Sequence, residues 1–484
     1  MGKLNILMVT AEHPAVTTTL GLGRSVDGLA RHLDGQGELE VRVLVPHNPS
    51  MPLSVGWEKV GDSKLYKNPG SGQVYVHQSH SFLTAPVGGS SLVVSAGSYA
   101  AGISVSAMND FLKYGDQFDQ VLQVMAQDGF RPDIVHCHDW PTAPIVDKCN
   151  AMGIKTVYTV HAGYDGRVPL STEAVNVLDG YLHLSDLSAT AVSRQLIFGC
   201  LSLQRRALSA DLWTSVSEPY AKYLSDESTP QWPVQWGVSG GLDGTVDDVF
   251  REYDVTIADP TNITDSELNG LEAVKAALKT KVYQELGYKG DRDAPLISMI
   301  GRLEDIKGVN RVLDILPEVS SACVLIGGPT SDQNIKYRLG HMRSTGDHII
   351  LNRFVEYGAA LQIIAASAFF LAPSWKEPEP DGYTAKEAVQ RATPVIFANL
   401  DGTGHLNLQQ RTKALLPFEA HWNDSIETYN ARLLAAINHA AEMPADKLRT
   451  MRRDLVNAVG AGVLSWEPAV TKCGEAYHAL VPNK

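Results

Sequence analysis

The sequence predicts two α/β domains, each built on a mostly parallel sheet. The chain has 484 residues, which is more than one ordinary hydrophobic core accommodates. Short apolar runs alternate with segments of helical periodicity, a pattern typical of doubly wound sheets. A polar, acidic segment at about residues 244–265 interrupts this alternation once, and the pattern then restarts. The interruption predicts the boundary between the domains.

The first series of predicted elements fills the N-terminal half of the chain. A strand buried on both faces is a continuous apolar run, so each such run fits the interior of a parallel sheet. We expect the first domain to span residues 1–245. Its predicted strands lie at 4–10, 40–46, 133–136, 155–160 and 212–216, and its helical segments include 25–33 and 116–125.

The second series follows a predicted helix at 271–286. We expect a second domain over residues 246–465, with 246–290 as its connecting segment. The tail at 466–484 is predicted to be a helix that returns toward the first domain. The predicted strands of the second domain lie at 295–300, 322–326, 348–351, 368–371 and 394–397.

Composition excludes several classes of partner. The formal net charge is −13, with 44% hydrophobic and 20% charged residues, so the basic surface that binds nucleic acid or anionic membranes is not expected. The uncharged stretch at 81–109 contains Gly, Ser and Pro throughout, which predicts a loop with small strands and no membrane span.

The five cysteines are scattered, without a CxxC pair or Cys/His metal spacing. This usage favours reduced thiols and a cytoplasmic protein without a metal site.

The ends of two predicted strands in the second domain carry a candidate anion site. In open α/β sheets ligands bind at the carboxyl ends of the strands, so we expect the active site between the two domains. Arg302 and Lys307 follow the strand at 295–300 and precede a helix. Arg offers a bidentate fork and Lys a point charge, which together suit a diphosphate.

A second candidate segment follows the strand at 368–371. Glu379 and Glu387 flank a Pro-Asp-Gly turn at 380–382, and a helix begins after it. The backbone N–H groups of such a turn can bind phosphate oxygens, and carboxylates can accept hydrogen bonds from sugar hydroxyls. The two segments together predict a site for a sugar joined to a diphosphate.

With these segments in view, the chain resembles the retaining glycosyltransferases of GT-B fold, and more closely the glycogen/starch synthase family. The similarity extends over nearly the whole chain, and the matching segments occur in the family's order. They are Phe130-Arg131-Pro132-Asp133-Ile134-Val135-His136-Cys137-His138-Asp139-Trp140, Thr159-Val160-His161, Ala210 to Ser217, Pro295 to Gly308, and Leu464-Ser465-Trp466. The resemblance implies an α/β, GT-B fold with two Rossmann-like domains facing across a cleft.

The resemblance also implies roles for single residues. The catalytic group would comprise His161 beside the donor sugar, Glu379 on the sugar hydroxyls, and Arg302 and Lys307 on the diphosphate. The acceptor would meet His138, Asp139 and Trp140. The donor would also contact Gly21 and Gly23 in a first-domain loop, the 381–384 segment, and Glu387 at the ribose. The donor-binding residues implied are Gly21, Gly23, Arg302, Lys307, Asp381, Gly382, Tyr383, Thr384 and Glu387.

The implied reaction is retaining transfer of a sugar, most simply glucosyl, from a nucleotide-diphosphate sugar to an acceptor hydroxyl. Arg302 and Lys307 would take the place of a metal ion, so we expect no metal and no cofactor. A dehydrogenase is disfavoured because Gly21-Leu22-Gly23-Arg24-Ser25-Val26 lacks the third glycine of a dinucleotide fingerprint. A phosphorylase would require pyridoxal phosphate.

The acceptor stays open between alternatives. Thr17-Thr18-Thr19 stands where glucan synthases carry a Lys-containing loop, and Asp381 and Tyr383 replace their Cys and Leu. These departures slightly favour a small, sugar-like or cyclitol-like acceptor over the end of a long glucan. The alternatives are a divergent glycogen/starch synthase that elongates an α-glucan, and a non-catalytic protein that binds nucleotide sugars.

Overall fold

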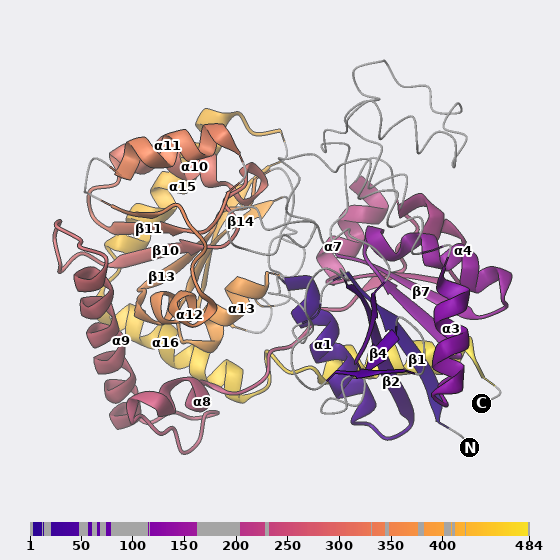
Figure 1. The fold of residues 1–484 in the computed structure, drawn as a ribbon. Coiled ribbons are helices and arrows are strands. Elements are labelled where there is room, and N and C mark those ends of the chain that lie inside the picture. The colour runs from indigo at the N-terminus through magenta and orange to yellow at the C-terminus, as the bar shows by residue number, and fades with distance from the viewer. Residues whose placement is uncertain are drawn as a thin grey trace, which may run out of the picture. The chain divides into compact units, whose positions relative to one another are not determined.

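A computed structural model of the chain describes residues 3–11, 13, 21–47, 57–60, 65–67, 74–78, 115, 117–161, 204–227, 232–330, 332–343, 348–375, 382–400, 408, 412–421 and 423–482. The described residues form two compact units (Figure 1). The first unit combines residues 1–241 with 466–484, and the second unit consists of residues 242–465. The predicted loop at 81–109 lies outside the described residues.

The first unit is built on a nine-stranded sheet with the order β3-β4-β5-β2-β1-β6-β7-β8-β9. Strand β4 pairs antiparallel with both β3 and β5, and the neighbouring pairs among β5, β2, β1, β6, β7, β8 and β9 are parallel. The strands are β1 (Leu4–Val9), β2 (Leu39–His47), β3 (Glu58–Lys59), β4 (Leu65–Lys67), β5 (Val74–Gln78), β6 (Ile134–His138), β7 (Lys155–Val160), β8 (Leu212–Ser215) and β9 (Trp236–Gly237).

The helices of the first unit follow the strands in alternation. The α-helices are α1 (Gly21–Asp34), α3 (Phe118–Gln127), α4 (Ala143–Ala151), α7 (Glu218–Lys222) and α17 (Glu467–Leu480). Shorter helical turns are η2 (Trp140–Thr142), η4 (Arg206–Ser209) and the π-helical η5 (Tyr223–Glu227).

Helix α17, which follows the second unit in sequence, packs with α1 in one hydrophobic core of the first unit. Its Trp466 flank lies so close to α1 that a Cβ on Gly28 would be 2.1 Å from Trp466 Cζ2. Alternate β1 residues Leu4, Ile6 and Met8 belong to this core, because successive side chains of a strand point to opposite faces.

The second unit is built on a six-stranded sheet, all parallel, with the order β12-β11-β10-β13-β14-β15. Its strands are β10 (Leu296–Ile300), β11 (Cys323–Gly327), β12 (Ile349–Leu351), β13 (Phe369–Ala372), β14 (Val395–Leu400) and β15 (Leu415–Ala420). All residues of β10 and β11 are buried, as their continuous apolar sequences predict.

Helices cover both faces of this second sheet. Figure 1 shows α10, α11 and α15 on one face and α9, α12, α13 and α16 on the other. The helices are α8 (Val246–Phe250), α9 (Asp265–Glu285), α10 (Val309–Ile315), α11 (Gln333–Arg343), α12 (Tyr357–Ala366), α13 (Tyr383–Gln390), α15 (Ile426–Ala441) and α16 (Ala445–Gly460), with short turns η6 (Arg251–Tyr253), η7 (Asp305–Lys307) and η8 (Leu316–Glu318).

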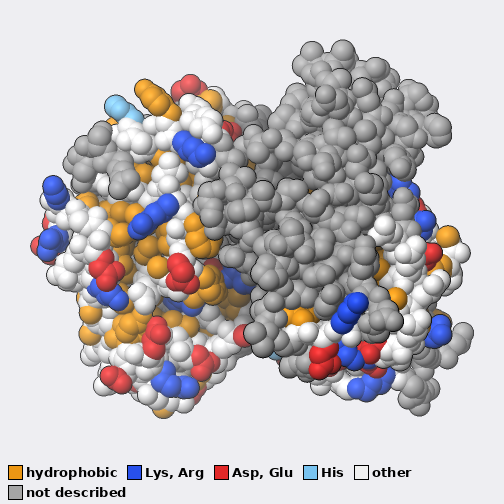
Figure 2. All heavy atoms as spheres, in the orientation of Figure 1, with side chains coloured by type: hydrophobic (Ala, Val, Ile, Leu, Met, Phe, Trp, Pro, Cys, Tyr) orange, Lys and Arg blue, Asp and Glu red, His pale blue; other side chains and the backbone are white. Residues whose placement is uncertain are grey.

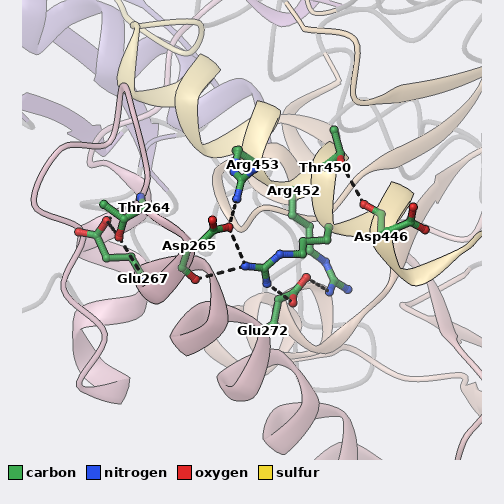
Figure 3. A network of polar contacts seen from close by, with 9 residues as sticks. Thr264, Asp265, Glu267, Glu272, Asp446, Thr450, Arg452 and Arg453 are labelled. Carbon is green, nitrogen blue, oxygen red and sulfur yellow. Dashed lines mark hydrogen bonds and ion pairs between the residues drawn. The ribbon is translucent and has the colours of Figure 1, made fainter.

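Helix α9 starts earlier than the periodicity predicts, at Asp265 rather than Leu271. Thr264 and Glu267 form a capping box in which each side chain binds the other's backbone N–H, and this box fixes the start. Arg449 and Arg452 of α16 then pair with Glu272 at 2.8 and 3.4 Å. Figure 3 shows Glu272 beside Arg452, and the start of α9 is thereby joined to α16.

The predicted fold class is confirmed. The two alternating series form one mostly parallel and one fully parallel sheet, with helices between the strands. Within the described part of the chain, each helix is too short or too polar to cross a membrane. On the face shown in Figure 2, the Lys and Arg side chains of the described residues are interspersed with Asp and Glu.

Candidate functional site

The strand order of each sheet reverses beside one central strand. In the second unit, β11 and β12 extend from one side of β10, while β13, β14 and β15 extend from the other. In the first unit the reversal lies between β1 and β6. Loops that leave neighbouring strands in opposite directions open a crevice at the carboxyl ends, where open α/β sheets bind ligands. The loops after β10, β13, β1 and β6 are therefore the candidate ligand-binding segments.

In the second unit the loops after β10 and β13 are fastened to each other. The backbone N–H of Trp375 donates to the Ile306 carbonyl at 2.8 Å. Gly308 has φ +77°, and a Cβ on it would lie 1.7 Å from the Pro373 carbonyl oxygen. Only glycine combines this left-handed conformation with so close an approach. Both segments that the sequence predicts as a diphosphate site therefore start from one edge of the sheet.

Arg302 and Lys307 lie in the loop after β10, and both are half-buried. Arg302 Nη1 donates to Glu304 Oε1 at 2.9 Å. The backbone N–H of Lys307 donates to the Glu304 carbonyl at 3.1 Å and so closes the turn η7. The loop thus places two cationic side chains at the carboxyl ends of the strands, and the Glu304 carboxylate restrains Arg302. Helix α10 begins directly after it, at Val309.

Helix α13 begins after the second loop. Gly382 is its N-cap, with φ +63°, and Tyr383 is its first residue. Tyr383 and Thr384 are half-buried, and backbone N–H groups in a first helical turn have no partner within the helix. Glu379 and Asp381 lie outside the described residues, so their roles stay predictions.

Glu387, the predicted ribose ligand, is buried in α13 with 3% of its surface exposed. The Tyr357 hydroxyl donates to Glu387 Oε1 at 2.9 Å. Burial lowers the pKa of Arg391, and the charges of Glu387 and Tyr357 oppose that shift. Sequence reasoning missed Tyr357, since no local pattern connects it with a carboxylate 30 positions away.

In the first unit, three histidines come together at the ends of β6 and β7. His138 Nδ1 lies 3.1 Å from His161 Nε2. The rings of His136 and His138 stack with their centroids 4.0 Å apart. Burial lowers the pKa of all three histidines well below the ordinary value, so the rings are neutral near pH 7. His136 was not predicted; the alternation His136-Cys137-His138 could have indicated it, because residues two apart share a face of a strand.

Asp139 connects the ends of β6 and β7 in a strained conformation. Its backbone has φ +66° and ψ +168°, a combination that residues other than glycine rarely adopt. Its backbone N–H donates to the Thr159 carbonyl at 2.8 Å, and its Oδ1 accepts from the His161 backbone N–H at 3.3 Å. Such strain persists where surrounding contacts impose it, often at functional sites.

Three predicted ligand-binding residues lie in surroundings that differ from those the sequence predicts. Trp140 has none of its surface exposed, so in this conformation its ring offers no surface to an acceptor. Gly21 and Gly23 were predicted in a loop, which is wrong: they are the first and third residues of α1. The apolar spacing of Leu22, Val26 and Leu29 extends the helix through the glycines, because packing outweighs their low helix propensity.

The described residues contain no group of three or more His, Cys, Asp or Glu side chains that could hold a metal ion. The four cysteines among them, Cys137, Cys149, Cys323 and Cys473, are buried and free. The expected independence of metal stays a prediction.

Comparison with known families and proteins agrees with this architecture. Residues 5–247 match the starch synthase catalytic domain, and residues 294–431 match the glycosyl transferases group 1. A glycogen synthase of Geotalea daltonii is 28% identical over 393 residues, covering 75% of each chain. Glycogen synthase 2 of Geobacter sulfurreducens is 33% identical over 279 residues, covering 53% of this chain and 54% of the relative.

Solved structures show the same fold. The catalytic domain of starch synthase IV from Arabidopsis thaliana matches with a TM-score of 0.67 at 20% identity, covering 100% of both chains. The trehalose-6-phosphate synthase OtsA matches with a TM-score of 0.56 at 14% identity, covering 97% of this chain and 98% of that chain. The predicted GT-B fold is confirmed, and the chain belongs to the starch synthase catalytic-domain family of glycosyltransferases.

Proposed function

We propose that the protein is a retaining glucosyltransferase that moves a glucosyl unit from a nucleoside-diphosphate sugar to the end of an α-glucan. The observation that carries this proposal is the joined pair of loops after β10 and β13. One loop holds Arg302 and Lys307, and the other leads to the start of α13. Two cations and a helix start at the reversal of strand order suit a diphosphate.

The α-glucan acceptor is supported by the relatives, which are named glycogen synthases. The departures at Thr17-Thr18-Thr19, Asp381 and Tyr383 favour a small acceptor, but the family resemblance assigns Asp381 and Tyr383 to the donor. The similarity to a glycogen synthase over 75% of the chain is therefore stronger support for a glucan acceptor than these departures are for a small one. A small sugar-like acceptor is the second candidate.

In the proposed reaction, the acceptor oxygen bonds to the anomeric carbon on the face from which the diphosphate departs. The bond from that carbon to the diphosphate oxygen breaks, and the acceptor's proton passes to the leaving diphosphate. Arg302 and Lys307 stabilise the charge on the departing group. Glu379 holds sugar hydroxyls, Glu387 binds the ribose, and His161 contacts the sugar.

Incubation with ADP-, UDP- or GDP-glucose and maltoheptaose tests the proposal. We expect a ladder of longer glucans, with new α-linkages that NMR coupling constants identify. Single addition to a small sugar, without glucan elongation, would support the second candidate. Thermal stabilisation by a nucleotide sugar without any product would indicate a non-catalytic binding protein.

We expect Arg302→Ala and Lys307→Ala each to weaken binding of the nucleoside diphosphate by ~10- to 100-fold, because a charge-assisted hydrogen bond contributes roughly 1.5–3 kcal/mol. Calorimetric titration with the diphosphate and with the nucleoside measures the effect, and nucleoside affinity should change little. Lys281→Ala is a matched control, since this side chain is exposed on α9 and pairs only loosely with Glu285 at 3.9 Å. Diphosphate affinity equal to wild type in both site variants contradicts the assignment.

We expect glucosyl transfer to continue in excess EDTA. The reason is that Arg302 and Lys307 neutralise the departing diphosphate, the task that a divalent cation performs in metal-dependent transferases. Initial rates with and without the chelator, each followed by added Mg²⁺ or Mn²⁺, measure the dependence. Activity that is lost in EDTA and restored by either metal contradicts the proposed mechanism.

A further inference from the structure

The hydrogen bond between His138 and His161 fixes where each ring carries its hydrogen. His138 Nδ1 and His161 Nε2 lie 3.1 Å apart. Both rings are neutral, so one of these two nitrogens carries a hydrogen and the other accepts it. Either His138 donates and His161 keeps its hydrogen on Nδ1, or His161 donates and His138 keeps its hydrogen on Nε2.

The second arrangement is disfavoured by the burial of His138. Its side chain is 2% exposed, and its Nε2 has no hydrogen-bond partner in the described part of the chain. A buried N–H group without an acceptor is rarer in proteins than a buried acceptor without a donor. The hydrogen of His138 therefore belongs on Nδ1, where it has an acceptor.

We propose that His138 is a positioning residue that donates a hydrogen bond from Nδ1 to His161 Nε2 and thereby holds the hydrogen of His161 on Nδ1. The role of this hydrogen bond in catalysis rests on the proposed function, in which His161 contacts the donor sugar. With its Nδ1 protonated, His161 presents a donor that can bind a sugar oxygen. This role differs from the direct acceptor contact that the sequence predicts for His138.

The ring of His138 is itself held in place by His136. The two rings stack at 4.0 Å with an angle of 29° between their planes. His136 is fixed at both nitrogens, by Tyr477 Oη on Nδ1 and by Thr159 Oγ1 on Nε2, each at 2.6 Å. Thr159 Oγ1 also lies 2.6 Å from Thr214 Oγ1. Residues of helix α17 and strands β7 and β8 thus fix His136, and His136 in turn holds the ring of His138 in place.

NMR of the protein labelled with ¹⁵N-histidine tests this proposal without measuring activity. Correlations from the ring carbon-bound hydrogens to the two nitrogens identify which nitrogen is protonated. The signals of His161 are those missing from the spectrum of His161→Gln. We expect wild-type His161 to be protonated on Nδ1. Protonation on Nε2 overturns the proposal, whether or not the protein transfers glucose.

Two variants of His138 separate positioning from packing. An asparagine amide nitrogen lies close to the position of Nδ1, so His138→Asn keeps a donor, while His138→Leu removes it. We expect His161 to keep its Nδ1 hydrogen in His138→Asn and to lose that preference in His138→Leu. Thermal melts check that both variants fold. If His138→Leu fails to fold, the wild-type and His138→Asn spectra still decide.

Kinetics distinguish this role from direct acceptor binding. Since one hydrogen bond is worth about 0.5–1.5 kcal/mol, we expect His138→Leu to lower kcat by roughly 3- to 10-fold, with the KM for maltoheptaose unchanged. His138→Asn should recover most of this loss. A raised KM for the glucan in both variants, with kcat and the His161 tautomer unchanged, overturns the proposal in favour of an acceptor ligand. A wild-type protein that elongates no glucan contradicts the proposed function alone.

Discussion

We expect Lys275→Met to lower the free energy of unfolding of the second unit by about 3–6 kcal/mol, because three buried acceptors lose their donor at ~1–3 kcal/mol each before relaxation. Lys275 extends from α9 and is 2% exposed. Its Nζ donates to the carbonyls of Ala365 and Arg391 at 2.7 and 3.0 Å and to Thr393 Oγ1 at 2.8 Å. These carbonyls lie at the C-terminal ends of α12 and α13, where backbone acceptors have no partner within the helix.

The hydrogen bonds show that Lys275 carries its charge. Burial, followed by the charges of Arg452 and Arg391, lowers the pKa of Lys275 well below its ordinary value. The Thr393 hydroxyl is committed as a donor to the Ile364 carbonyl at 2.8 Å, so Lys275 must supply all three of its hydrogens. The negative ends of two helix dipoles favour an ammonium group there. Methionine matches its length but supplies no donor.

Lys279→Met, one turn further along α9, is the matched control. Lys279 Nζ makes long hydrogen bonds of 3.3 Å to the carbonyls of Asp293 and Ala294 and lies 5.7 Å from the centre of the Tyr283 ring. We expect its loss to lower the free energy of unfolding by less than ~1 kcal/mol. Because two units can unfold separately, hydrogen exchange of peptides from β13 and β14 should report the stability of the second unit. An equal loss of unfolding free energy in the two variants would show that the buried hydrogen bonds of Lys275 do not stabilise the second unit.

We expect Gly308→Ala to destabilise the second unit by roughly 2–5 kcal/mol, since a left-handed non-glycine residue costs ~1–2 kcal/mol and overpacking a further ~1–3 kcal/mol. The added Cβ would lie 1.7 Å from the Pro373 carbonyl oxygen. Either this carbonyl moves or the loop after β10 moves. Movement would also disturb the Tyr429 hydroxyl, which donates to the same oxygen at 2.8 Å.

This substitution should impair ligand binding as well as stability. Arg302 and Lys307 lie in the loop that Gly308 ends, so separation of the two loops should weaken diphosphate binding in the fraction that remains folded. Gly287→Ala is the control: Gly287 has φ +66°, but a Cβ on it meets nothing within 4 Å. We expect Gly287→Ala to lower the free energy of unfolding by about 1–2 kcal/mol and to leave diphosphate affinity unchanged. Equal losses at both positions would show that the approach to Pro373 is unimportant.

The sequence by itself determined the elements whose signal is local. Continuous apolar runs such as Leu296 to Ile300 become central strands, because a parallel strand covered on both faces needs apolar residues throughout. The alternation of strands and helices then allows few topologies. Arg302 and Lys307 could be chosen as candidates because they follow a strand, and strand ends are where such sheets bind ligands. His138 and His161 became candidates through the family resemblance of the segments that contain them.

Tertiary structure alone decided how distant residues meet. The partners of Lys275 lie 90, 116 and 118 positions away, and Tyr477 reaches His136 across 341 positions. Sequence periodicity reports only neighbours within a turn or along a strand. The burial of Trp140 and Glu387 and the orientation of His138 toward His161 depend on packing between segments. The hydrophobic and hydrogen-bonding energy of these contacts outweighs local propensity, and therefore no local pattern encodes them.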